Sequence, residues 1–101
     1  MYLIELLIPL FDNAGNAFPQ HLHNLVRSEL TQQFGGVTAF QRAPAEGVWK
    51  HEGQVERDQI VIFEVMSGDL DRGWWSRYKA RLESRFSQDQ IVIRVFEFEQ
   101  L

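Results

Sequence analysis

Residues 59–66, with the sequence QIVIFEVM, form the stretch that decides the fold. Four β-branched residues and a Phe in eight positions are typical of a β-strand. Successive side chains of a strand point to opposite faces, and Val61, Phe63 and Val65 give this strand one uniformly apolar face. The opposite face carries Glu64 between apolar neighbours. The strand therefore buries one face against another layer and presents a mixed face on its other side.

Three other stretches have the same character. Residues 2–10 and 90–99 are rich in Ile, Leu and Val, and residues 37–43 form a shorter candidate that ends before Pro44. Their alternate positions repeat the division into an apolar face and a face of mixed apolar and charged side chains. A four-stranded sheet with one buried face accounts for all four stretches.

Two segments carry apolar residues with the spacing of an α-helix. The first segment follows Pro19, a residue that suits the first turn of a helix. It ends at Gly35 and Gly36, because glycine readily adopts the left-handed conformation that closes a helix. The second follows Asp69 and Asp71, and either aspartate can cap its start. The apolar stripes are Leu22, Val26, Leu30 and Phe34 in the first helix, and Trp75, Tyr78, Leu82 and Phe86 in the second.

The order β-α-β-β-α-β predicts one ferredoxin-like α+β domain over residues 1–101. We expect a four-stranded antiparallel sheet in the strand order 4-1-3-2, with two helices on one face. Between the second and third strands lies GVWKHEGQVERD, residues 47–58. Residues 48–51 and 54–57 can pair as an extended hairpin, because Gly53 suits the second position of a tight turn.

Composition limits the functional classes. The chain has 101 residues and no Cys, which excludes disulfides, thiolate metal sites and a thiol nucleophile, and fits a reducing cytoplasm. Its formal net charge of −4 disfavours nucleic acid as a partner. No apolar run approaches the roughly 20 residues that span a bilayer, so no membrane partner is expected.

The sheet face that points away from the helices is the predicted binding surface. Glu5, Glu64, Arg42 and Arg94 lie on it among apolar side chains that include Phe40. An apolar patch of this kind marks an interaction surface, so we expect a homodimer or a higher homo-oligomer through this face. The four charged residues either form an ion-pair network between subunits or provide the polar groups of a ligand cleft.

The hairpin adds candidates to that cleft. Trp49 can stack on a ligand, and Arg42 and Arg94 can hold an anionic group through their guanidinium forks. We therefore expect a small anionic or aromatic ligand and no cofactor. The sequence leaves open whether the protein is an enzyme: Glu64 or His51 can serve as a proton shuttle, and a purely structural assembly is a third interpretation.

Other polar residues are expected to be solvated. His21 and His23 diverge by about 200° on a helix, so they do not converge on a metal ion. The basic residues of the second helix, including Arg81 and Arg85, are interpreted as a solvated face. No metal site is therefore predicted.

Several stretches together resemble a group of small uncharacterised bacterial proteins of ferredoxin-like fold. They are FGGVTAF (34–40), VWK (48–50), IVIFEVM (60–66), WWSRYKARLESRF (74–86) and QDQIVIRV (88–95). The resemblance covers nearly the whole chain and implies the fold, but its residues are mostly structural and imply no activity. A looser architectural likeness to dimeric α+β barrel proteins, which include small enzymes, is an analogy of fold only.

Overall fold

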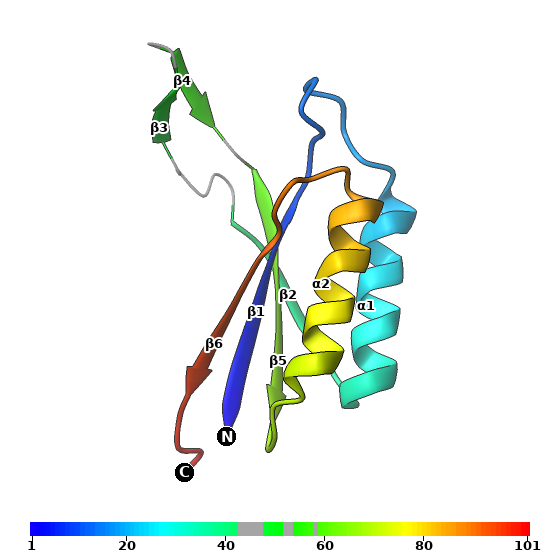
Figure 1. Cartoon of the computed structure of the whole chain (residues 1–101), viewed down its shortest axis with the longest axis vertical. Helices are drawn as coiled ribbons and strands as arrows, with labels where there is room; N and C mark the ends of the chain where they lie inside the picture. Colours follow the sequence, from blue (N-terminus) through cyan, green and yellow to red (C-terminus); the bar gives the residue numbers. More distant parts are fainter. Residues whose placement is uncertain (43–47, 52–53, 58) are drawn as a thin grey trace.

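Figure 1 shows the helices α1 and α2 packed beside a sheet, with the β3–β4 hairpin extending beyond it. The computed structural model describes the backbone of residues 1–42, 48–51, 54–57 and 59–101, and the side chains of residues 1–40 and 59–101. Neither helix has the length and apolar composition needed to cross a membrane. The elements are β1 (Tyr2–Pro9), α1 (Gln20–Phe34), β2 (Thr38–Arg42), β3 (Val48–His51), β4 (Gln54–Arg57), β5 (Ile60–Ser67), α2 (Arg72–Arg85) and β6 (Val92–Glu97).

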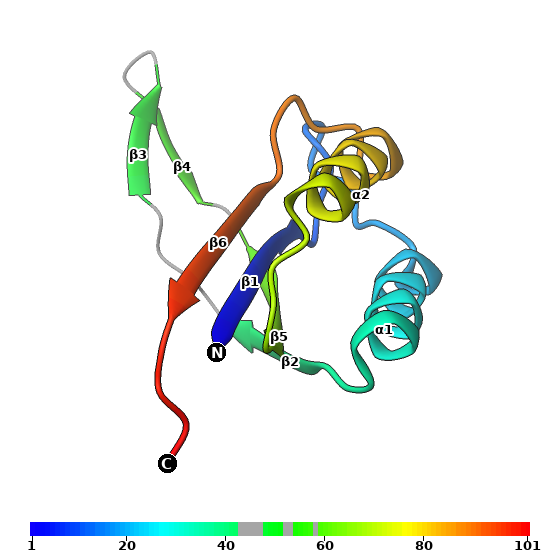
Figure 2. The same cartoon turned by 60° about the horizontal axis from the view of Figure 1, so that its bottom comes forward.

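The main sheet of the described residues is antiparallel, with the order β2-β5-β1-β6. The four predicted strands correspond, in chain order, to β1, β2, β5 and β6. In those numbers the observed order, read from β6, is the predicted 4-1-3-2. Both helices lie on one face of the sheet (Figures 1 and 2). The predicted ferredoxin-like α+β fold is therefore confirmed.

The predicted hairpin forms a separate two-stranded sheet beyond the main one (Figure 1). Its backbone register pairs Val48 with Arg57 and His51 with Gln54, as the sequence predicted. The turn at residues 52–53 lies outside the described residues.

The core lies between the sheet and the two helices. Ile4, Leu6 and Ile8 of β1 and Phe63 of β5 are fully buried, so alternate strand positions face the helices as predicted. Burying one such side chain contributes about 1.5–3 kcal/mol. The helix residues in the same buried cluster are Val26, Leu30, Trp75, Tyr78, Leu82 and Phe86.

The edge strand β6 is less well covered than the central strands. Ile93 is only partly buried and Val95 is exposed, although both positions belong to the helix-facing set by strand alternation. The helices cover the centre of the sheet, so their cover ends before the outer edge. Val95 therefore lies on the helix-facing side, as predicted, but it remains exposed there.

A single carboxylate links the two helices, and we call this arrangement the Glu29 clamp. Glu29 of α1 accepts hydrogen bonds of 2.6 and 3.0 Å from Arg85 and one of 3.1 Å from the Tyr78 hydroxyl, both on α2. Arg81 lies 3.6 Å from the same carboxylate. Burial alone would raise the pKa of Glu29, but the hydrogen bonds and positive charges around it lower that pKa. The expectation that Arg85 is solvated is wrong, because its side chain is mostly buried in the clamp.

We expect Glu29→Gln to lower the free energy of unfolding by about 1–3 kcal/mol at neutral pH, because Arg85 loses its charged partner. Folding lowers the pKa of Glu29. The clamp therefore adds to the free energy of unfolding when the pH is above the pKa that Glu29 has in the unfolded chain. This contribution is lost as the pH falls through the pKa of Glu29 in the folded protein. Urea unfolding at neutral and acid pH measures both effects. Glu99→Gln, at an exposed position, is the control. The prediction would be contradicted if the difference in the free energy of unfolding between Glu29→Gln and wild type did not shrink at acid pH.

The C-terminus of α1 requires a glycine at one position. Gly35 has φ = 79°, and its N–H donates to the Thr31 carbonyl at 2.8 Å. Its neighbour Gly36 has no positive φ and no atom close to where a Cβ would stand.

Gly35→Ala should therefore lower the free energy of unfolding by about 1 kcal/mol, because a Cβ strains the left-handed conformation. Gly36→Ala is the matched control and should have a much smaller effect. Thermal or urea unfolding of the two variants checks this, and equal losses would argue against a left-handed cap at Gly35.

Candidate functional site

A row of four side chains crosses the sheet face that points away from the helices, which we call the helix-free face. The register places Thr38 opposite Glu64, Glu64 opposite Glu5, and Glu5 opposite Arg94. Directly opposite residues lie on the same face of a sheet, so they form one line across the four strands. The structure thus brings together three of the predicted site residues, Glu5, Glu64 and Arg94.

The centre of this row is a coupled group of charges. Arg94 Nη2 lies 3.1 Å from Glu5 Oε1, and Glu64 lies directly opposite Glu5 on the other neighbouring strand. Burial and the negative charge of Glu5 raise the pKa of Glu64. Of the two carboxyl groups, only Glu5 forms an ion pair with Arg94 within the described residues, and Glu64 is the one whose pKa is raised. A protonated Glu64 can donate a hydrogen bond or a proton.

Apolar rows lie on both sides of the charged row. Among their members, Met66, Phe96 and Val92 are exposed although they are large and hydrophobic. The 46% exposure of the Arg94 side chain shows that its guanidinium also reaches solvent beside its pair with Glu5. The apolar rows consist of Met66, Leu3 and Phe96 on one side, and Phe40, Ile62, Leu7 and Val92 on the other.

Three other predicted site residues have side chains that lie outside the described residues. Arg42 is the last residue of β2, and its backbone is in register with Ile60, two rows from Glu64 on the same strand pair. Trp49 and His51 belong to β3. Their proposed contacts stay predictions. Phe40 is described, and it is half-buried on the helix-free face opposite Ile62.

The expectation that both helix-start histidines are solvated is wrong for His23. This residue is only 4% exposed, its Nε2 lies 3.0 Å from the Pro9 carbonyl oxygen, and its ring packs against Phe86. Its Nδ1 is buried without a hydrogen-bond partner in the described part of the chain. His23 precedes Val26 by three residues, a helical spacing that could have identified it as a core position.

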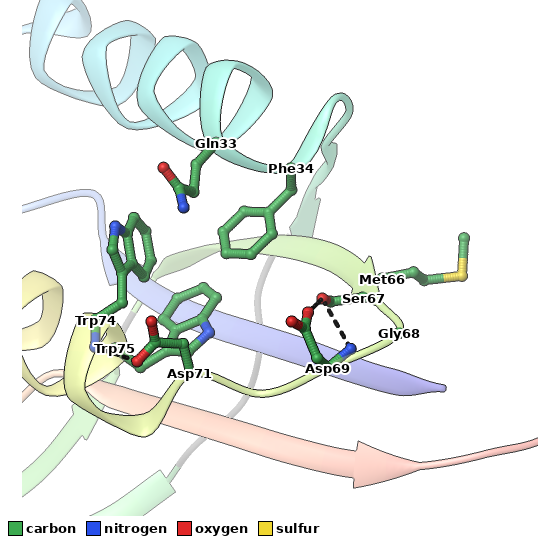
Figure 3. Close-up of a pocket in the computed structure, with 9 residues that line it drawn as sticks. All are labelled: Gln33, Phe34, Met66, Ser67, Gly68, Asp69, Asp71, Trp74 and Trp75. Carbon is green, nitrogen blue, oxygen red and sulfur yellow. Dashed lines mark hydrogen bonds between the residues drawn. The ribbon is translucent and has the colours of Figure 1, made fainter.

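A pocket that sequence reasoning missed lies at the end of the sheet between the two helices (Figure 3). It has a volume of about 370 Å³ and is lined by the end of α1, the connection from β5 to α2, and the first turn of α2. We call it the tryptophan pocket because Trp74 and Trp75 form part of its wall. Asp69 and Asp71, which the sequence marked only as helix caps, lie at its rim; of the two, Asp71 is the residue that caps α2.

No protein-family model matches the sequence, and no curated protein matches it. Solved structures define the class of fold as a small ferredoxin-like α+β protein. One of these is a variant of CutA1 from Pyrococcus horikoshii OT3, with a TM-score of 0.61 and 14% identity over 100% of this chain and 86% of that one. Another is a phage SAM lyase in complex with S-methyl-5′-thioadenosine, with a TM-score of 0.62 and 13% identity over 95% of this chain and 80% of that one. At such low identity the likeness establishes the fold alone.

We expect Glu5→Gln to lower the raised pKa of Glu64, because it removes the neighbouring negative charge. Burial is the largest cause of the shift and stays in place, so the pKa should return only part of the way to its ordinary value. Carboxyl ¹³C chemical shifts followed through a pH titration measure it. Glu97→Gln, on the exposed end of β6, should leave the Glu64 titration unchanged.

The same shift sets the sign of a stability effect. Folding raises the pKa of Glu64. Protonation of Glu64 therefore stabilises the folded protein when the pH is below the pKa that this residue has in the unfolded chain. This stabilisation is lost as the pH rises through the pKa of Glu64 in the folded protein. This trend is opposite to that of the Glu29 clamp. A Glu64 titration midpoint that does not respond to Glu5→Gln would contradict the coupling.

Proposed function

We propose that the protein is a homo-oligomeric, cytoplasmic small-molecule-binding domain whose cleft lies between the helix-free face and the β3–β4 hairpin. One observation carries this proposal: the charged row of Glu64, Glu5 and Arg94 lies between two apolar rows, of which Met66, Phe96 and Val92 are exposed and Ile62 is buried. Water is a poor partner for that apolar surface, and a monomer would leave it uncovered.

A second copy of the chain fits the charge pattern of this face. From β5 to β6 the row reads acid, acid, base. A two-fold axis that runs along β1 between two facing sheets would set Glu64 of one subunit against Arg94 of the partner subunit. Arg94 has five N–H donors, so it can bind Glu64 there while it keeps Glu5. Covering the apolar rows contributes about 25 cal/mol per Å² before the costs of association.

A small anionic or aromatic molecule fits the cleft that such a pair would enclose. The half-exposed side chain of Arg94 can hold a ligand carboxylate where the partner subunit's Glu64 does not bind it, Phe96 offers a ring for stacking, and Glu64 can supply a polar contact. Arg42 and Trp49 would complete the cleft from β2 and the hairpin. The phage SAM lyase of similar fold was solved with S-methyl-5′-thioadenosine, which supports the capacity of this fold to hold a small molecule with an aromatic ring.

The raised pKa of Glu64 also supports a second function, that of an enzyme without a cofactor. In that case Glu64 would transfer a proton to or from a substrate held by Arg94, with His51 as the alternative shuttle. A substrate proton would have to lie within hydrogen-bond reach of the Glu64 carboxyl group. The binding function requires only the cleft and is therefore the leading proposal.

Arg94→Ala should weaken self-association or ligand retention at least about tenfold, because it leaves a buried carboxylate without its partner. Arg81→Ala is the matched control, since Arg81 lies on α2, far from the helix-free face, and is mostly exposed. Light scattering after size-exclusion chromatography measures the association. Equal, negligible effects of both variants would count against the site.

Native mass spectrometry of freshly purified protein reports the number of copies and any bound small molecule together. We expect a dimer or higher oligomer that carries an additional mass. An oligomer without such a mass would leave assembly as the function of this face, and a bare monomer at every concentration would overturn both parts of the proposal.

A further inference from the structure

The tryptophan pocket has a preformed aromatic wall. Phe34 and Trp75 stack with an interplanar angle of 12° and a centroid distance of 5.2 Å. Trp74 stands edge-on to both, at 87° to Phe34 and 84° to Trp75. The rings hold one another in place, so little side-chain freedom is lost when a ligand binds. A volume of about 370 Å³ lies in the size range of small-molecule sites.

The pocket contains a hydrogen-bond donor that a ligand can reach. Trp75 is only 7% exposed, but its indole N–H is not among the buried unpaired groups of the described residues, so this donor is reached from the open pocket. Figure 3 shows the indole nitrogen on the ring edge that faces Asp69, so this N–H points into the pocket. A ligand with an acceptor atom would satisfy this donor.

The rim of the pocket is negative. The Ser67 hydroxyl donates to Asp69 Oδ1 at 3.1 Å and fixes that carboxylate beside the pocket (Figure 3). Asp71 uses Oδ1 to cap α2 through the Trp74 N–H at 3.0 Å, which leaves its second oxygen available. Within the described ranges, neither aspartate has an ion-pair partner. The last turn of α1 carries no basic residue, so its carbonyl groups add to the negative potential.

Arg77 is the cation that opposes this potential. Its Nη1 and Asp71 Oδ1 lie 3.3 and 3.5 Å from the point where a Cβ on Gly73 would stand, yet the two side chains form no ion pair. The Arg77 guanidinium is therefore near Asp71, while Asp69 lies on the β5–α2 connection beside Ser67. A metal ion fits less well, because no group of three or more His, Cys, Asp or Glu residues converges in the described part of the chain.

We propose that the tryptophan pocket is a binding site for a small organic cation, a protonated amine with an apolar body and a hydrogen-bond acceptor. The ammonium group lies between Asp69 and Asp71. The apolar body packs against Phe34 and Trp74, and the acceptor takes the Trp75 N–H. This site lies between the ends of the helices, and it shares Met66 with the helix-free face, but none of the proposed ligand contacts involves that residue.

Tyramine is a suitable probe, since it combines a protonated amine with an aromatic ring and a phenolic oxygen. Its matched controls are 4-hydroxyphenylacetate, which carries the opposite charge, and the neutral 2-(4-hydroxyphenyl)ethanol. Two-dimensional ¹H–¹⁵N spectra of the full chain resolve the tryptophan indole signals, and Trp75→Phe assigns one of them. We expect tyramine to shift the Trp75 indole signal saturably, with an affinity at least about tenfold higher than either control. Equal affinities for the three probes, or no shift of that signal, would overturn the proposal.

Variants separate the charge from the aromatic wall. Asp69→Asn and Asp71→Asn should each weaken tyramine binding about three- to tenfold, and Asp71→Asn should keep the helix cap because Asn caps as well as Asp. Arg77→Gln should strengthen binding, and the exposed Asp89→Asn should leave it unchanged. Circular dichroism melts verify that each variant is folded. If Asp89→Asn weakens binding as much as Asp69→Asn does, the effect comes from overall charge and the proposed site is wrong.

Discussion

Burial of alternate residues of β1 and β5 beneath the two helices is the constraint on which the other features depend. Ile4, Leu6 and Ile8 of β1 are fully buried, and so is Phe63 of β5, which lies opposite Leu6. Because side chains alternate along a strand, this burial forces Glu5 and Glu64 onto the opposite face. A slip of one residue would bury both carboxyl groups in the core. The same hydrophobic pattern therefore stabilises the fold and positions the candidate site.

Much of this arrangement could be predicted from the sequence because it depends on local periodicity. The strand and helix spacing gave the element order, the helix-facing residues and the shared face of Glu5, Glu64 and Arg94. Their direct alignment could not be derived, because register depends on how two strands meet in space. The exposure of Val95 was missed for a similar reason: alternation shows which face a residue is on, but not how far the helices extend over it.

The features that sequence reasoning missed arise from contacts between distant segments. A helical stripe indicates the direction of the core but not the neighbouring helix, so the bonds of Glu29 to Arg85 and Tyr78 were not predicted. The tryptophan pocket is built by the end of α1, the β5–α2 connection and the start of α2. Its aromatic and acidic residues each had a sufficient local explanation, as core positions or helix caps, and only their proximity indicates a common role.

The edge strand β6 has a consequence for how copies of this chain can meet. No strand of the described residues pairs with its outer side, so its backbone groups there could recruit a strand from another molecule and start an open-ended fibre. Charged Arg94 and Glu97 within the strand, and Glu99 beyond it, make such strand addition unfavourable. Growth from edge to edge is thus resisted, while contact through the broad face stays open, and that geometry favours small closed particles over filaments.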